Sequence, residues 1–234
     1  MPGQTNAGPL RQAQLWLAAP ACGIVAGRDG GSRKARRALE RNASRALLAE
    51  TGAPQMPQRS LSHSGGCAAI AIAPAGCRAG VDIETATPRD VRSIARFAFS
   101  PDEARELRAL ALPAAIARFY VMWTLKEAFA KALGMPLLAA LRECAFTFRD
   151  SCWAGRIPTA EPWRATVFKP RPLLTLAAVV VGPCDTPRDD WACWEWPVLA
   201  EPSWLCLTAF VADNRRDQPQ AADRPAAESR IKTI

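Results

Sequence analysis

The stretch PAAIARFYVMWTLKEAFAKAL, from Pro113 to Leu133, predicts the most clearly marked helix of the chain. Proline suits the first turn of a helix. Gly134 and Pro136 follow the last apolar residue, which is a typical C-terminal stop signal. At 1.5 Å per residue such a helix is about 30 Å long. We therefore expect one continuous helix over this segment.

Two sides of this helix differ in chemistry. The side expected to face the core carries Met122, Leu125, Phe129 and either Ala132 or Leu133. Trp123, Glu127 and Lys131 recur every four residues and so lie together on another side. That flank offers an aromatic ring, an acid and a base. An ordinary Glu–Lys pair beside a core tryptophan would explain the same spacing, which on its own is weak evidence for a site.

Helix and strand signals mix along the rest of the chain. Ser32 to Glu50 has the composition of a helix. Thr87-Pro88 and Ser100-Pro101 each place a capping residue before proline, and Glu103 completes a capping box with Ser100. Strands are predicted at residues 15–17, 67–73, 81–84, 145–148, 164–168, 173–181, 191–196 and 205–211. Because the two types do not alternate strictly, the pattern favours the α+β class.

A pair of acids lies on one predicted strand. Cys67–Ala73 and Val81–Glu84 flank the turn Pro74–Gly80, which together predict a hairpin. Asp82 and Glu84 are two residues apart, so their side chains point to the same face, while the residues between and before them face the core. The two acids could join on a divalent cation. A solvated acidic strand end is the commoner explanation of such a pair.

The segment SLSHSGG, from Ser60 to Gly66, predicts a loop whose hydroxyl and backbone donors could bind a phosphate. A hydroxyl-rich turn that satisfies only its own backbone is an equally good interpretation. The segment contains His63, the only histidine of the chain. A multi-histidine metal site is therefore excluded, and any metal should be a hard cation bound by carboxylates.

Composition and charge limit the class of protein. The chain has 234 residues, of which 49% are hydrophobic, so it can bury a core. Its formal net charge of +8 indicates an anionic partner, namely a nucleic acid, a phosphorylated small molecule or an acidic protein. Seven basic and two acidic residues lie between Arg28 and Arg45, a segment that could clamp phosphates, bind nucleic acid or form a solvated face.

The eight cysteines have no C-x-x-C spacing, which predicts reduced thiols. No apolar run approaches the roughly 20 residues that a membrane helix needs. From these two features we expect a soluble, cytoplasmic protein.

Four segments, taken in order, resemble motifs of the 4'-phosphopantetheinyl transferase family, of the larger surfactin-synthetase-activating (Sfp) type. They are Ser60–Ser64 (SLSHS), Gly80–Glu84 (GVDIE), Ala95–Glu103 (ARFAFSPDE) and Trp123–Lys131 (WTLKEAFAK). The order and spacing of the last three are specific to that family. Enzymes of this family move the phosphopantetheine arm of coenzyme A onto a serine of a carrier protein.

The resemblance implies an α+β fold with pseudo-twofold symmetry. It predicts a monomer of two similar α/β halves, each with a small antiparallel sheet packed on a long helix. Residues 15–78 would form the N-terminal half, and residues 79–212 the C-terminal half with the metal site. A flexible N-terminus (residues 1–14) and a disordered tail (residues 213–234) would flank them. Coenzyme A and magnesium would lie at the junction of the halves.

The resemblance also implies the roles of individual residues. Mg²⁺ would be held by Asp82, Glu84 and Glu127 against the pyrophosphate of coenzyme A. Glu127 would help to deprotonate the carrier serine and Lys131 would contact a phosphate, which makes these two the catalytic residues. The positions that match coenzyme A contacts are Ser60, Ser62, His63, Arg41, Arg45, Lys126 and Lys131. The partner would be an acidic apo acyl or peptidyl carrier protein, with no nucleic acid and no membrane involved.

Some features depart from the family pattern. The family commonly has a basic Gly-Lys-Pro-like stretch before the serine–histidine motif, whereas this chain has TGAPQMPQR from Thr51 to Arg59, in which Arg59 could substitute. The tryptophan-rich region from Trp153 to Trp204 has no counterpart and could contact a carrier protein or fill the core. Two alternatives stay open. One is a basic nucleic-acid-binding module, which gives Asp82 and Glu127 no role, and the other is a carrier-binding relative without catalysis.

Overall fold

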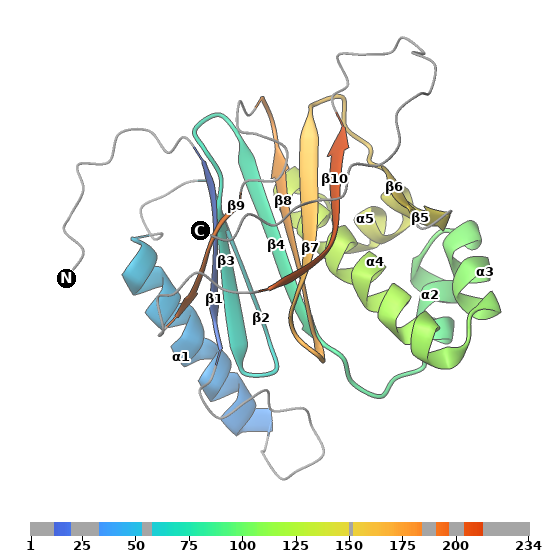
Figure 1. Cartoon of the computed structure of the whole chain (residues 1–234), viewed down its shortest axis with the longest axis horizontal. Helices are drawn as coiled ribbons and strands as arrows, with labels where there is room; N and C mark the ends of the chain where they lie inside the picture. Colours follow the sequence, from blue (N-terminus) through green and yellow to red (C-terminus); the bar gives the residue numbers. More distant parts are fainter. Residues whose placement is uncertain are drawn as a thin grey trace.

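Two four-stranded sheets pack face to face between helices (Figure 1). The computed structural model describes residues 12–19, 33–52, 58–149, 152–183, 191–196 and 204–212. The helices are α1 (Arg33–Thr51), α2 (Val91–Ala98), α3 (Pro101–Ala109), α4 (Leu112–Leu133) and α5 (Leu137–Glu143). The strands are β1 (Ala13–Ala18), β2 (Arg59–Ser64), β3 (Cys67–Ile72), β4 (Arg78–Thr85), β5 (Ala145–Arg149), β6 (Cys152–Arg156), β7 (Trp163–Arg171), β8 (Leu174–Val181), β9 (Trp191–Trp196) and β10 (Leu205–Ala212).

Sheet A has the strand order β2-β3-β1-β9, and α1 covers its outer face. The antiparallel strands β2 and β3 are joined by Gly65 and Gly66, whose φ angles of 60° and 86° suit a two-residue hairpin turn. β1 pairs antiparallel with β3 and parallel with β9. Leu47 of α1 packs with Ile70 and Ile72 of β3. This contact forms the core between the helix and sheet A.

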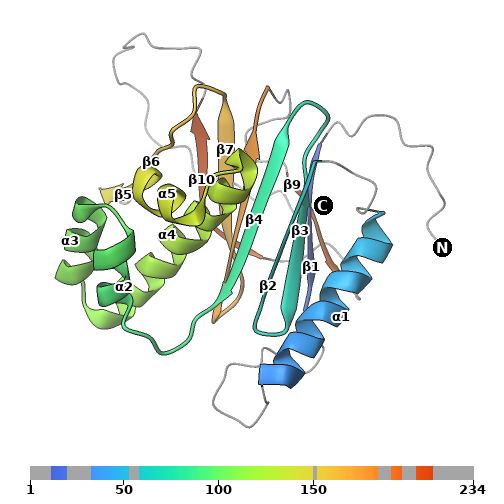
Figure 2. The same ribbon diagram turned by 180° about the vertical axis from the view of Figure 1, so that it is seen from behind.

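Sheet B has the order β10-β7-β8-β4 and is antiparallel throughout. α4 crosses the face of sheet B that is remote from sheet A (Figure 2). Gly80 of β4 lies directly against this helix, because a Cβ built there would be 1.9 Å from the carbonyl oxygen of Ala128. A residue without a side chain is therefore required for β4 and α4 to approach so closely.

The two sheets meet along β2 and β4, which lie side by side (Figures 1 and 2). The Val81 N–H donates to Ser60 Oγ at 3.0 Å, and the Thr85 N–H donates to Ser64 Oγ at 3.0 Å. Serine hydroxyls of β2 thus satisfy backbone donors of β4 that a neighbouring strand would otherwise bind. These bonds fix β4 against sheet A.

The structure confirms the α+β class and the main helix signals. α4 begins at Leu112 and ends at Leu133, and Gly134 has the left-handed φ of 65° expected of a C-terminal glycine. Ser100 and Glu103 form the predicted capping box of α3. Each four-stranded sheet packs on one long helix, α1 or α4, as the pseudo-twofold expectation requires.

β9 departs from that expectation. It is parallel to β1, so sheet A is not purely antiparallel, and it returns to sheet A from the C-terminal part of the chain. The division at residues 78 and 79 therefore does not separate the strands of the two sheets. The boundaries of the halves stay a prediction, and the predicted flexible residues 1–11 and the tail from residue 213 lie outside the described residues.

Three local predictions are wrong. β3 and β4 do not form a hairpin, because the turn at Pro74–Cys77 carries the chain from sheet A into sheet B. Residues 60–64 form strand β2 and not a loop, because the following glycines supply the turn. Asp90, and not Thr87, caps α2 with its side chain. The elements α5 and β6 carried no clear signal in the sequence.

The tryptophans between residues 153 and 204 whose side chains the structure describes are buried or half-buried, and several of them pack on other aromatic rings. Trp163 lies edge-on to Phe129 in the core beside α4, and Trp194 stacks on Trp16 with ring centroids 4.5 Å apart. Trp204 lies edge-on to Phe168. The core-filling interpretation of this region is therefore favoured.

Among the described helices, none is long and apolar enough to cross a membrane.

Candidate functional site

Three carboxylates from two elements meet at the edge of sheet B. Asp82 and Glu84 come from β4 and Glu127 from α4, and one carboxylate oxygen of each lies within 4.8 Å of those of the other two. The alternation of β4 explains the first pair, because Val81 and Ile83 point into the core between the sheets. We call Asp82, Glu84 and Glu127 the acid cluster.

Asp82 is the most deeply buried member of the cluster, with 2% of its surface exposed. Its Oδ1 accepts hydrogen bonds from Ser62 Oγ at 2.7 Å and from Lys131 Nζ at 3.0 Å. Its Oδ2 is buried and has no hydrogen-bond partner in the described part of the chain. Burial raises the pKa of Asp82, and the charge of Lys131 only partly opposes this. An unpartnered carboxylate oxygen of this kind would be stabilised by a bound cation.

Glu84 and Glu127 are half-buried. Glu84 accepts a hydrogen bond from Ser64 Oγ at 3.3 Å, and its pKa is raised by burial and then by the charge of Asp82. Burial and the same neighbour raise the pKa of Glu127 to about 7, although Lys131 acts in the opposite direction. Without a cation Glu127 can therefore gain or lose a proton near neutral pH, and a bound cation would favour its charged form.

The donor set of the acid cluster fits a hard divalent cation. Carboxylate oxygens are the ligands that Mg²⁺ prefers, and a strand and a helix supply them from two directions. No histidine or cysteine joins the group among the residues that the structure describes. The unpartnered Oδ2 of Asp82 gives such an ion an oxygen that is not already committed to a proton donor.

Lys131 lies one turn beyond Glu127 on α4. Its ammonium group donates to the Val81 carbonyl oxygen at 2.8 Å as well as to Asp82. About one third of the side chain is exposed (33%), so the amine is held at the edge of the acid cluster and still reachable from solvent. Lysine in this position can contact an anion that approaches the cluster.

A hollow of about 580 Å³ opens on the same side of α4 as Lys131. Its wall includes the side chains of Arg59 and Arg78. Arg78 is held there by bonds to the Ala132 carbonyl oxygen at 3.0 Å and to Glu161 at 2.7 Å. A hollow with three basic residues, adjoining three acids, suits an anionic ligand that also coordinates a cation.

The segment that carries the acid cluster also matches a protein family. Residues 78–173 match the model of the 4'-phosphopantetheinyl transferase superfamily. The matched segment runs from β4 to the end of β7, so it contains all three acids and Lys131. It does not include β2 or α1, which carry the serine, histidine and arginine residues assigned by resemblance.

Comparison with solved structures finds a similar chain in a holo-(acyl-carrier-protein) synthase from Bacillus anthracis, in complex with coenzyme A (3',5'-ADP). The two chains are 16% identical, and the alignment covers 44% of this chain and 93% of that chain, with a TM-score of 0.38. No curated protein matches the chain.

The resemblance to the transferases assigned Ser60, Ser62 and His63 of β2 to coenzyme A. Their side chains lie on two different faces of the strand. Ser60 and Ser62 are buried and bond β4, and Ser62 reaches the acid cluster. The side chain of His63 is 54% exposed, and its Nδ1 lies 3.6 Å from Glu40 of α1. Because residues of a strand alternate, the histidine faces α1 while its serine neighbours face β4. The coenzyme A contacts of these residues stay predictions.

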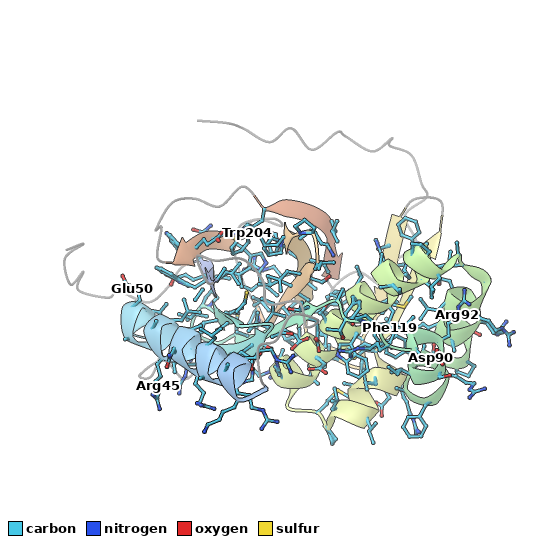
Figure 3. The ribbon with its side chains drawn as sticks, turned by 90° about the horizontal axis from the view of Figure 1, so that it is seen from below. Arg45, Glu50, Asp90, Arg92, Phe119 and Trp204 are labelled. Atoms are coloured by element: carbon cyan, nitrogen blue, oxygen red, sulfur yellow. The ribbon has the colours of Figure 1, made fainter. Side chains whose placement is uncertain are left out.

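Arg41 and Arg45 are exposed on α1, and Figure 3 shows Arg45 on the outer side of this helix. The α1 side chain that pairs with Glu40 is Arg36, at 3.8 Å. Glu40 in turn lies beside His63. Arg36 is therefore the arginine of α1 whose contact with the Glu40–His63 pair the structure describes. The predicted roles of Arg41 and Arg45 stay untested.

The structure does not bring Lys126 to the acid cluster. Its side chain is fully buried and forms an ion pair with Glu103 at 2.9 Å. Its ammonium group also donates to the carbonyl oxygens of Leu141, at 2.7 Å, and Cys144. All three donors are therefore occupied within the protein, and the geometry gives no support to the predicted contact with coenzyme A.

One residue of the site was missed in the sequence. Ser64 donates to Glu84 and accepts from the Thr85 N–H, so it joins the cluster to β2. The signal was available, since serines at positions 60, 62 and 64 have the period of a strand and a Gly-Gly turn follows them.

Proposed function

We propose that the protein transfers the 4'-phosphopantetheine group of coenzyme A to a serine of an apo acyl or peptidyl carrier protein, in a Mg²⁺-dependent reaction. The observation that carries this proposal is the convergence of Asp82 and Glu84 from β4 with Glu127 from α4. The superfamily match of residues 78–173 supports it. Two sheets, each with its own long helix, are consistent with the larger, two-half type of transferase.

Magnesium, when bound by the acid cluster, would neutralise charge on the diphosphate of coenzyme A. The carrier serine oxygen would attack the phosphorus next to the pantetheine arm. A new P–O bond forms, the diphosphate P–O bond breaks, and adenosine 3',5'-bisphosphate leaves. Glu127 would take the serine proton directly or through water.

The basic residues near the cluster would bind the anionic parts of the substrates. Lys131 would contact a phosphate of coenzyme A, and the hollow that Lys131 lines together with Arg59 and Arg78 would hold another part of that ligand. The net charge of +8 would draw an acidic carrier protein towards this surface.

The test is to incubate the protein with Mg²⁺, coenzyme A and an apo carrier protein, and to measure the intact mass of the carrier. We expect a gain equal to one phosphopantetheine group, dependent on all three additions. A carrier that is bound but not modified would indicate the non-catalytic alternative. Salt-sensitive binding of nucleic acid, with no modification of any carrier, would favour the nucleic-acid-binding alternative.

In the absence of a bound metal ion, the free energy of unfolding should depend on pH through the carboxyl groups of the acid cluster. Burial raises the carboxyl pKa values of the acid cluster, that of Glu127 from 4.5 to about 7. Because the folded pKa lies above the unfolded one, this contribution to stability is present below about 4.5 and is lost as the pH rises through about 7. Mg²⁺ should offset the loss, since it binds the charged form in the folded state.

We therefore expect Mg²⁺ to raise the melting temperature more at pH 8 than at pH 6, as measured by thermal unfolding with Mg²⁺ and with a chelator. In Glu127→Gln, the pH dependence of the chelated protein should become smaller. An equal effect of Mg²⁺ at both pH values would contradict the assignment of the ion to this cluster.

A further inference from the structure

The side chains of Lys126 and Glu127 are neighbours in sequence and lie in different environments. Glu127 joins the acid cluster, whereas Lys126 is 0% exposed and pairs with Glu103, which is 1% exposed. The Lys126 ammonium group donates to Glu103 Oε2 and to the carbonyl oxygens of Leu141 and Cys144. It also lies 4.7 Å from the centre of the Phe99 ring. This lysine is therefore bound from three sides.

The carboxylate of Glu103 also accepts hydrogen bonds on both of its oxygens. Its Oε2 accepts from Ser100 N–H at 3.0 Å and from Ser100 Oγ at 2.8 Å, in addition to Lys126. Its Oε1 accepts from the Phe146 N–H at 2.9 Å. The pair thus connects α4 with the start of α3, the end of α5 and the start of β5. We call the side chains of Lys126 and Glu103, with these bonds, the buried lock.

Apolar packing does not by itself define one face of α4. Buried side chains occupy four successive positions, Phe119 to Met122, and three more from Ala128 to Ala130. Four successive residues cover the whole circumference of a helix. Burial is interrupted mainly along the flank of Trp123, Glu127 and Lys131. A fixed polar contact on the buried side therefore adds to what determines the rotation of the helix.

The buried lock supplies such a contact at the position next to Glu127. The fully buried ammonium group cannot be solvated by water, so it depends on Glu103, 2.9 Å away, and on the two carbonyl oxygens. Gly80 sets how near α4 approaches β4. The buried lock holds α4 from the side of α3, α5 and β5, so α4 is bound on two sides, next to Glu127 and next to Ala128.

We propose that Lys126 is a positioning residue, which with Glu103 fixes the rotation of α4 and so holds Glu127 in the acid cluster, and that it does not contact coenzyme A. The activity readout of this inference rests on the proposed function, but its structural and metal-binding readouts do not need carrier modification.

The test compares Lys126→Met with the double variant Lys126→Met, Glu103→Gln. The single variant leaves the Glu103 carboxylate buried without a counter-ion and should unfold at a markedly lower temperature. The double variant removes both charges in similar volumes and should regain much of that loss. Arg142→Met serves as the control, because it removes an exposed positive charge from the neighbouring helix α5.

In the folded double variant we expect the affinity for Mn²⁺, used as the probe ion, to fall by about 10-fold or more. The kcat for transfer should fall by a similar factor while the KM for coenzyme A stays within about 2-fold of the wild type. The control should show neither change. A crystal structure of the double variant should place the Glu127 carboxylate outside the group formed by Asp82 and Glu84.

An intact acid cluster and wild-type Mn²⁺ affinity in the folded double variant would overturn the proposal. A raised KM for coenzyme A with unchanged kcat would do so as well, because it would make Lys126 a ligand contact. If the wild-type protein modifies no carrier, the proposed function fails, and the inference is then decided by the crystal structure and the Mn²⁺ affinity alone.

Discussion

Asp82→Asn should lower kcat/KM for phosphopantetheine transfer by on the order of 1,000-fold. Asp82 is the most buried acid of the cluster, and its Oδ2 is the oxygen without a partner. Asparagine keeps the shape, and its amide oxygen can still accept from Ser62 and Lys131 as Oδ1 of the carboxylate does. It removes the charge that a magnesium ion needs, and it places an NH2 group, which cannot bind a cation, where the unpartnered Oδ2 lies. The rate should be measured by the attachment of phosphopantetheine to an apo carrier protein.

The same substitution should not weaken the metal-free fold. Burial raises the pKa of Asp82, which means that the charged carboxylate is disfavoured where it lies. A neutral residue of equal size should therefore give a melting temperature equal to or above that of the chelated wild type. Asp102→Asn, on the exposed first turn of α3, is the matched control and should keep full activity. An Asp82→Asn protein with more than about a tenth of wild-type activity would remove Asp82 from the mechanism.

Gly80→Ala should both destabilise the protein by about 3 kcal/mol and reduce transfer by about 100-fold. The added methyl group would meet the backbone of Ala128, with its carbonyl oxygen at 1.9 Å and its carbonyl carbon at 2.9 Å. Backbone cannot rotate away as a side-chain end can, so β4 and α4 must move apart. Asp82 lies two residues beyond Gly80, and Glu127 directly precedes Ala128, so the movement would open the acid cluster. Denaturant unfolding and the carrier assay measure the two effects.

Gly76→Ala separates crowding from backbone strain. Gly76 has a φ of 80° in the turn before β4, and a Cβ there would meet nothing within 4 Å. Alanine should cost about 1 kcal/mol at this position, from the left-handed conformation alone, and leave the rate of transfer unchanged. Equal losses of activity in the two variants would show that the contact between Gly80 and Ala128 does not set the geometry of the cluster.

Features that depend on neighbours in sequence could be predicted. The caps of α3 and α4, the shared face of Asp82 and Glu84, and the separate flank of Glu127 and Lys131 follow from helix and strand periods. The meeting of the strand acids with Glu127 could not be obtained in this way. It depends on the contact of β4 with α4, and only the family resemblance indicated it.

The wrong predictions have a common physical cause. The local sequence does not indicate which sheet a strand joins. β3 and β4 were therefore predicted to form a hairpin, although the turn between them leads from sheet A to sheet B. The assignment of Lys126 to coenzyme A, which stays a prediction, came from its match to a lysine of the family motif. Helix geometry places the side chains of Lys126 and Glu127 about 100° apart, but the sequence does not show which neighbouring residues each of them meets.

The parallel pairing of β9 with β1 affects how the protein can be made. β1 emerges from the ribosome before the other described elements, and its neighbour β9 emerges only after all of β2 to β8. The β1 edge of sheet A therefore stays unpaired while β2 to β8 are synthesised, and during that time it is exposed to other nascent chains or to chaperones. If the gene were split between the two halves, sheet A would be complete only after the first fragment had bound β9 of the second, whereas all four strands of sheet B come from residue 78 onward.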